Sequence, residues 1–364
     1  MREFRRGFGR ALAVWVSAAV LSVGSCAAVA YERTANPADY RGVGNGVEEL
    51  VEIKSGDTLS SLGAELVERK IVASTKAFNT AAANNPNADS ITPGVYKLEG
   101  RMSAASAVEA LTDLNNRVEQ LIVTGGQTME DITVVGGQVR NGIFSSIANV
   151  TGNALTVDDL RTAAGTASLE DLGVPAWAQT AVSARGTDPR RIEGLILPGS
   201  YVIHPERGAV QTLHDLIQTS MEQLTEDEQR YATLVEASLV ERESLEADFP
   251  KVARVILNRL ANNMRLELDS TVNYDLSEQE VATTSSDRAR VTAWNTYAMN
   301  GLPATPIGAP SLEAIQAVAH PADGSWLFFV TVDKSGTTVF TNTFEEHQAA
   351  VAQAQANGVL DSQR

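Results

Sequence analysis

Residues 231–245 are Tyr-Ala-Thr-Leu-Val-Glu-Ala-Ser-Leu-Val-Glu-Arg-Glu-Ser-Leu, and this stretch decides the fold of the C-terminal half. Leu234, Ala237 and Val240 recur at helical spacing, which predicts a helix with one broad apolar stripe. Glu236, by contrast, is expected to point largely away from that stripe. Glu243 follows Val240 by one helical turn, so its carboxyl is expected beside the apolar stripe.

The position of Glu243 leaves two interpretations open. Apolar neighbours would desolvate the carboxyl and raise its pKa, which a general acid for glycosidic cleavage requires. Alternatively, Glu243 is an ordinary exposed carboxylate, and the periodicity alone favours this second interpretation. The neighbouring Glu241 is expected to pair with a nearby arginine rather than to act in catalysis.

Further motifs stand in a fixed order on both sides of this helix. They are Glu-Gly-Leu-Ile-Leu-Pro-Gly-Ser-Tyr at 193–201, Val-Ala-Arg-Val-Ile-Leu-Asn-Arg-Leu at 252–260, Met-Arg-Leu-Glu-Leu-Asp-Ser-Thr-Val at 264–272, Trp-Asn-Thr-Tyr at 294–297, Gly-Leu-Pro at 301–303, Ala-His-Pro at 319–321, Leu-Phe-Phe-Val at 327–330, Phe-Thr-Asn-Thr at 340–343 and Glu-His at 346–347. Together with Ala-Ser-Leu-Val-Glu-Arg-Glu at 237–243, they resemble the endolytic murein transglycosylases, the YceG-like family.

This resemblance assigns the catalytic role to Glu243, because the catalytic glutamate of the family is the second acidic residue of its Glu-Lys-Glu motif. It implies a lyase that cleaves the MurNAc-GlcNAc bond of nascent peptidoglycan strands in mid-strand and leaves a 1,6-anhydroMurNAc end. One carboxyl suffices for that reaction, since the C6 hydroxyl of the sugar replaces water as the nucleophile. Penicillin-binding proteins and other wall-synthesis proteins are implied as partners.

Six further residues are candidate substrate contacts: Asn295, Thr296, Tyr297, Asp269, Thr271 and Tyr201. Amide, hydroxyl and aromatic groups suit the hydroxyls and ring faces of a sugar. For residues 295–297 a helix-capping loop is the alternative, and for Asp269 a salt bridge to Arg259 or Arg265.

Two positions depart from the family pattern: Gly199 replaces an aspartate and Ser270 a proline. The charged segment 276–290 has no clear counterpart in that pattern, and a lid or a family-specific loop is expected there.

The N-terminal end predicts membrane attachment. Residues 11–31 carry no charge, a length that spans a bilayer as a helix. Four arginines precede them in residues 1–10, which predicts a cytoplasmic N-terminus and an exported body. The family resemblance implies that the membrane is the bacterial cell membrane. A cleaved signal peptide is the alternative. Cys26, the only cysteine, is expected to be a buried thiol of this helix, with lipidation as the alternative.

The exported part is predicted to be an α+β protein. A linker (residues 32–47) leads to a subdomain (48–118) with the order strand, helix, helix, strand, in which Thr58 can cap the first helix. Gly-Asp-Thr-Leu-Ser-Ser-Leu at 56–62 and Pro-Gly-Val-Tyr-Lys-Leu at 93–98 resemble a LysM glycan-binding module, and a structural adaptor without sugar affinity is the alternative. A connecting α/β region (119–190), a mixed α/β catalytic domain with a glycan cleft (191–352) and a tail (353–364) complete the expected order.

Composition excludes some functions. A net charge of −16 argues against nucleic acid as a partner, because phosphate backbones are bound by clustered basic residues. The four scattered histidines and single cysteine have no metal-ligand spacing, so no metal or cofactor is expected. A non-catalytic, membrane-anchored protein that binds peptidoglycan or acts as a scaffold is the competing function.

Overall fold

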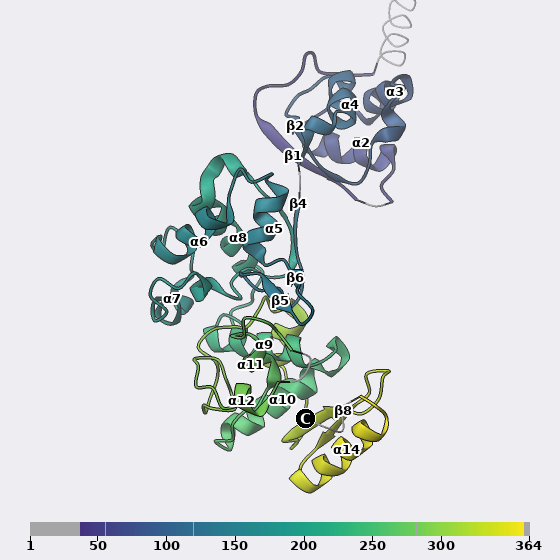
Figure 1. The fold of residues 1–364 in the computed structure, drawn as a ribbon. Helices are drawn as coiled ribbons and strands as arrows, with labels where there is room; N and C mark the ends of the chain where they lie inside the picture. The colour runs from purple at the N-terminus through teal and green to yellow at the C-terminus, as the bar shows by residue number, and fades with distance from the viewer. Residues whose placement is uncertain (1–36, 55, 119, 281–282, 360–364) are drawn as a thin grey trace, which may run out of the picture. The chain divides into compact units, whose positions relative to one another are not determined.

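The computed structural model describes residues 37–359 apart from 55, 119, 281 and 282. The chain divides into two compact units, Met1–Glu119 and Gln120–Arg364, whose elements are labelled in Figure 1. The predicted cytoplasmic end, membrane helix and Cys26 lie outside the described residues. Among the helices that are described, none is long and apolar enough to cross a membrane.

The first unit is a three-stranded antiparallel sheet with three helices. β1 (Glu48–Ile53) pairs along its whole length with β2 (Gly94–Glu99), and β3 (Arg117–Val118) pairs with the other edge of β2. Between the strands the chain forms α2 (Leu59–Glu68), α3 (Thr75–Asn84), η1 (Ala88–Ser90), α4 (Ala104–Thr112) and η2 (Leu114–Asn116).

The first four main elements follow the predicted order of strand, helix, helix and strand. Thr58 caps α2 because its hydroxyl accepts a hydrogen bond from the Ser61 N–H at 3.1 Å, while the Ser61 hydroxyl accepts one from the Thr58 N–H at 3.0 Å. The apolar faces of the helices and of the sheet enclose a core that includes Phe78 and Tyr96. α4 and β3 extend the unit beyond the predicted motif.

The second unit begins with strands that join distant parts of the sequence. β4 (Gln120–Val123) pairs antiparallel with β7 (Gly199–Val202), and β5 (Ile132–Val134) forms a hairpin with β6 (Gln138–Arg140). Gly136 and Gly137 form the turn of this hairpin with φ values of 97° and 79°, a backbone conformation that glycine adopts without strain. The intervening elements are α5 (Ile143–Val150), α6 (Val157–Thr166), α7 (Ala176–Ser183) and η3 (Pro189–Ile192).

The rest of the second unit is mostly helical and ends in a small sheet. The elements are η4 (Pro205–Arg207), α8 (Gly208–Met221), α9 (Tyr231–Glu243), η5 (Glu246–Asp248), α10 (Phe249–Ala261), α11 (Asp269–Asn273), α12 (Ser285–Arg288), α13 (Leu312–Ala319), β8 (Phe328–Thr331), β9 (Thr338–Thr341) and α14 (Phe344–Ala356). β8 and β9 are antiparallel, and α14 packs on both. α14 extends into the segment predicted to be a tail.

One hydrophobic core extends from Leu121 to Val318. It includes residues of both the predicted connecting region and the predicted catalytic domain, so these two segments fold together.

α9 passes through that core, packed against α13, α10, α11 and α7. All its residues from Thr233 to Val240 are buried, so the helix is enclosed on all sides rather than along one stripe. Glu236 was expected to point away from the core and is instead only 8% exposed, and burial raises its pKa to about 7.

Candidate active site

Glu243 is the last residue of α9, where the helix emerges from the core. Ser244 adopts extended backbone angles (φ −152°, ψ 174°) and ends the helix. Val240 is fully buried, whereas Glu241, Arg242 and Glu243 are only partly buried. The packing of α9 thus places the Glu243 carboxyl at the edge of the core rather than inside it.

Ser270 in the first turn of α11 is the direct partner of this carboxyl. Its hydroxyl donates a hydrogen bond to Oε1 of Glu243 at 2.5 Å. The backbone N–H of Ser270 also bonds to this carboxyl. Ser270 therefore orients the Glu243 carboxyl through both its side chain and its backbone.

The surroundings of Glu243 raise its pKa. Burial is the largest cause, and the nearby Asp269 carboxylate acts in the same direction. Hydrogen bonds from Ser270 and the positive charge of Arg242 favour the ionised form but do not outweigh burial. Glu243 can therefore carry a proton closer to neutral pH than an exposed glutamate does, as a general acid must.

Asp269 is held in place by three donors. Its Oδ1 accepts hydrogen bonds from the Tyr297 hydroxyl at 2.7 Å and the Thr283 hydroxyl at 2.9 Å, and its Oδ2 forms an ion pair with Arg288 at 3.0 Å. Arg288 also lies over the Tyr297 ring, 5.1 Å from its centroid. Asp269 thus acts on Glu243 as a fixed negative charge.

The arginine partner predicted for Glu241 and the alternative salt bridges of Asp269 are not formed. Asp269 pairs with Arg288 rather than with Arg259 or Arg265. Glu241 accepts hydrogen bonds from the N–H of Ser311 at 3.1 Å and from its hydroxyl at 2.5 Å, so it binds the start of α13 instead of an arginine. A Cβ at Gly125 would lie 2.1 Å from Oε1 of Glu241, so a larger residue there would displace this carboxylate from Ser311.

Thr271 and Thr296 form a buried hydroxyl pair behind the site. Both side chains are 0% exposed, and their hydroxyl oxygens lie 2.9 Å apart. The Thr271 hydroxyl donates to the carbonyl of Leu268 at 2.6 Å and accepts from the Thr296 N–H at 3.2 Å. These bonds attach α11 to the 294–297 motif, and direct sugar contact by either threonine stays a prediction.

Asn295 organises the loop that carries Arg288. Its buried amide donates to the carbonyls of Asp287 at 3.3 Å, Arg288 at 3.1 Å and Arg290 at 2.5 Å, and its Oδ1 accepts from the Tyr297 N–H at 2.9 Å. The helix-capping alternative stated for residues 295–297 is not formed as expected, because Asn295 bonds to the end of the preceding helix α12 and Ser311 caps the next helix, α13. Tyr297 alone of the three is partly exposed and bonded to Asp269.

Tyr201 belongs to a different set of contacts. It lies on β7, is 6% exposed, and its hydroxyl donates to the carbonyl of Leu197 at 2.7 Å and lies 2.9 Å from the Ser220 hydroxyl. Gly199 on the same strand is exposed and pairs with Val123. A substrate contact at Tyr201 stays a prediction.

The segment 276–290 is attached to the rest of the site at both ends. The N–H of Gln279 donates to the carbonyl of Thr133 at 2.7 Å, and the N–H of Val135 donates to the carbonyl of Gln279 at 3.0 Å. The Gln279 side chain accepts from Arg242 at 3.5 Å. These contacts join the segment to the β5–β6 hairpin, while Arg288 joins it to Asp269.

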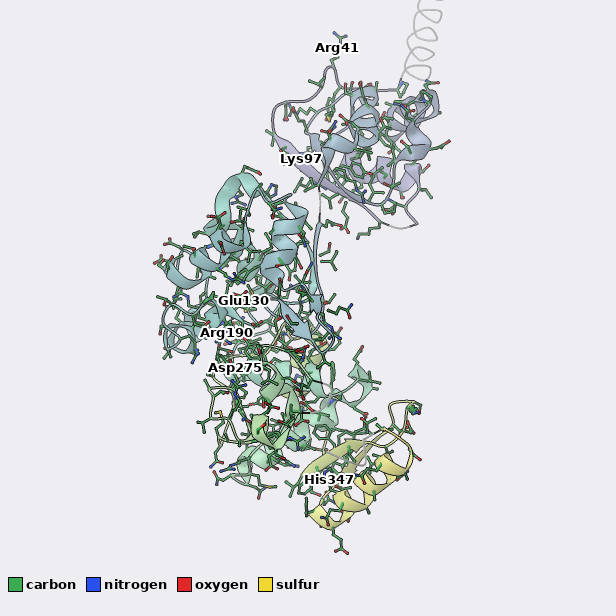
Figure 2. All side chains as sticks on the ribbon, in the orientation of Figure 1. Arg41, Lys97, Glu130, Arg190, Asp275 and His347 are labelled. Carbon is green, nitrogen blue, oxygen red and sulfur yellow. The ribbon has the colours of Figure 1, made fainter. Side chains whose placement is uncertain are left out.

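Two cavities adjoin this region and share Thr128 and Ile132 in their walls. The larger, of about 520 Å³, is lined by Glu130, Arg190 and Asp275, which Figure 2 labels along one side of the second unit. The smaller, of about 360 Å³, is lined by Arg140 and Arg242. Sequence reasoning did not select Arg140, because a lone arginine in a short strand carries no signal of its own.

Glu193, in the wall of the larger cavity, is another carboxyl of raised pKa. It is 0% exposed and accepts hydrogen bonds from the Tyr274 hydroxyl at 2.8 Å and the Met129 N–H at 3.0 Å. Burial outweighs these bonds and raises its pKa to about 8. Since the side chain is enclosed, it links η3, α11 and the loop after β4.

No group of three or more His, Cys, Asp or Glu side chains suited to a metal ion occurs among the residues that the structure describes. Glu243 therefore combines a raised pKa with a hydroxyl partner at the edge of an α+β core, an arrangement that suits a single-carboxyl acid/base.

Comparison with known proteins identifies the family. The model of the YceG-like family matches residues 51–353, and the chain belongs to this family. The endolytic murein transglycosylase of Bacillus subtilis (strain 168) is 25% identical over 319 residues, covering 82% of this chain and 83% of that protein. The Streptococcus pneumoniae (strain ATCC BAA-255 / R6) protein of the same name is 24% identical over 333 residues, covering 83% of this chain and 58% of that protein.

A solved structure shares the fold. The crystal structure of a putative yceG-like protein from Listeria monocytogenes superposes with a TM-score of 0.54 at 24% identity, covering 83% of this chain and 98% of that one. The predicted membership of the YceG-like family is therefore confirmed.

Proposed function

We propose that this chain is an endolytic peptidoglycan lytic transglycosylase in which Glu243 is the only catalytic acid/base. The observation that carries the proposal is the Glu243 carboxyl, which lies at the end of α9, is only partly buried, is held by Ser270 and has a raised pKa. Membership of the YceG-like family and relatives named endolytic murein transglycosylase support peptidoglycan as the substrate.

In the first step, the protonated Glu243 donates its proton to the oxygen that bridges MurNAc and GlcNAc as the C1–O bond breaks. The carboxylate that results then accepts the proton of the MurNAc C6 hydroxyl, whose oxygen bonds to C1 and closes a 1,6-anhydro ring. The same group thus acts first as acid and then as base, and no water is consumed. Atoms balance, because the GlcNAc fragment gains the proton that the C6 hydroxyl loses.

The contacts of Asp269 fit a mechanism with one carboxyl. A two-carboxylate glycosidase needs a second group free to attack or to activate water. Asp269, which is close enough to influence Glu243, is bound to Tyr297, Thr283 and Arg288. In the proposal it stabilises positive charge that develops at C1, and the exposed part of Tyr297 contacts the sugar.

The remaining parts of the chain extend this proposal. Residues 11–31 would anchor the enzyme in the bacterial cell membrane, and the unit built on β1 and β2 would act as a LysM-like module close to the glycan. Such an anchor keeps the site near newly made strands, where penicillin-binding proteins and other wall-synthesis proteins are the proposed partners. Cleavage within the strand would then end its elongation.

The proposal is tested by incubating the full-length protein with purified uncrosslinked peptidoglycan strands and identifying the products by mass spectrometry. Anhydro-ended internal fragments are expected from the wild type and not from Glu243→Gln, which keeps the shape of the side chain but cannot transfer the proton. Glu246→Gln is the matched control, because Glu246 is an exposed carboxylate three residues further on.

Products with reducing ends and one added water would show a hydrolase instead. Strands left intact by the wild type would refute catalysis and favour a protein that only binds peptidoglycan.

A further inference from the structure

The cavity of about 360 Å³ beside α9 has an unusual charge for this chain. Arg140 and Arg242 both line it, and no aspartate or glutamate does. The protein as a whole carries a net charge of −16. Two arginines around one cavity without an acidic residue therefore stand out from the rest of the molecule and point to an anionic ligand.

The fold holds both arginines at this cavity from separate elements. Arg140 ends β6, and the backbone of the β5–β6 hairpin is hydrogen-bonded to Gln279. The side chain of Gln279 in turn accepts from Arg242 near the end of α9 at 3.5 Å. The two guanidinium groups are thus brought together by contacts that do not neutralise them.

Neither guanidinium forms an ion pair within the described part of the chain. Arg242 donates to the carbonyl of Gly126 at 3.2 Å and to the neutral Gln279, which leaves part of its five-donor group unused. Arg140 is exposed. Burial and the like charge of Arg140 lower the pKa of Arg242 and outweigh the opposite effect of Glu243 and Glu193, so an anion bound between the two arginines would relieve the remaining repulsion.

We propose that this cavity binds a carboxylate of the peptide stem carried by the MurNAc residue next to the bond that is cleaved. The inference rests on the proposed function, because the substrate of Glu243 is then peptidoglycan, whose stems carry free carboxylates along the whole strand. The charge of Arg242 acts on the Glu243 carboxyl, so an anion held by Arg242 would lie close to the reacting bond. Arginine matches a planar carboxylate through paired N–H donors.

The experiment compares two forms of the same uncrosslinked strands: one with free stem carboxylates and one whose carboxylates are converted to neutral carboxamides. The full-length wild type is expected to cleave the free form with a kcat/KM about 3- to 10-fold higher, the effect of one or two partly exposed charge-assisted hydrogen bonds. Arg140→Gln is expected to abolish this preference by raising KM on free strands only.

Arg140 is the better position to change, since Arg242 also affects Glu243 directly. Arg140→Lys, which keeps the charge, is expected to retain part of the preference. Arg230→Gln is the matched control, because it removes an exposed arginine from the opposite end of α9 and is expected to change neither rate.

Equal cleavage of the two forms by an active wild type would overturn the inference while leaving the proposed function intact. The same result is expected if the cavity instead binds the pyrophosphate of a lipid-linked strand, since carboxamide formation leaves that group unchanged. The inference would also be overturned if Arg140→Gln lowered kcat/KM by the same factor on both forms of the strands. Cleavage of neither form by the wild type would refute the proposed function and the inference with it.

Discussion

Replacing Ser270 by alanine tests how Glu243 is prepared for its two roles. The Ser270 hydroxyl donates to Oε1 of Glu243 at 2.5 Å, and alanine removes this donor without changing the backbone of α11. A hydrogen bond to a charged group contributes about 1.5 to 3 kcal/mol. That free energy favours the carboxylate over the carboxylic acid, so its loss raises the pKa of Glu243 further.

The change is measured in the pH dependence of strand cleavage. Glu243 must be protonated in the first step, so kcat/KM falls as pH rises through its pKa. In Ser270→Ala this descending limb is expected at higher pH. The carboxylate that forms on proton donation also loses about 1.5 to 3 kcal/mol of stabilisation, so kcat at the optimum falls by about 10- to 160-fold. KM is expected to change little.

Ser270→Thr is the matched control, because it retains a hydroxyl at the same position. Its kcat/KM is expected to fall at the same pH as that of the wild type. Thermal unfolding of all three proteins verifies that each is folded. The reasoning would be refuted if Ser270→Ala left both kcat and the pH dependence of kcat/KM unchanged. It would also be refuted if Ser270→Ala and Ser270→Thr lowered kcat equally.

Two further predictions concern stability. Glu193 has a pKa raised from 4.5 to about 8, so its stabilising contribution is fully present below about pH 4.5 and is lost as pH rises through about 8. The unfolding free energy of the wild type is therefore expected to fall by up to about 5 kcal/mol between pH 4.5 and 8 because of Glu193. In Glu193→Gln this contribution to the fall is expected to be absent. Denaturant titrations at several pH values measure this, and parallel curves for the two proteins would contradict it. Asn295→Ala leaves three carbonyls without their amide partner and is expected to cost about 2 to 4 kcal/mol and to lower activity, because the loop carrying Arg288 loosens. Thermal unfolding and cleavage rates test this prediction. A loss of unfolding free energy below about 0.5 kcal/mol would show that the loop does not depend on the Asn295 amide.

The sequence predicted local structure well where one pattern dominated. The order of β1, α2, α3 and β2 follows from apolar spacing and from the turn and cap at Gly56–Thr58, and α9 ends within two residues of its predicted end. Such patterns suffice because a helix or strand depends on neighbours a few residues away. The ordered motifs around Glu243 also led to the YceG-like family, which the family comparison confirms.

The burial of α9 on all sides could not be read from its periodicity, because Glu236 and Ser238 occupy buried positions among apolar neighbours. Ser238 does so by donating to the carbonyl of Val235 at 2.7 Å and accepting from the N–H of Ile307 at 3.0 Å. The hydroxyl of Ser238 therefore has both a hydrogen-bond acceptor and a donor inside the core, so this polar side chain can be buried. Apolar periodicity does not reveal such partners.

The sequence alone determined that Glu243 stands near the end of a helix within a set of family motifs. Only the tertiary structure decided what surrounds it: Ser270 on Oε1, Asp269 fixed by Arg288, and Glu241 directed to Ser311. These partners are 19 to 70 residues apart in the chain and meet through the packing of α9 against α11 and α13 and of α11 against α12. The pKa of a carboxyl depends on burial and on charges a few ångströms away, and those distances exist only in the folded chain.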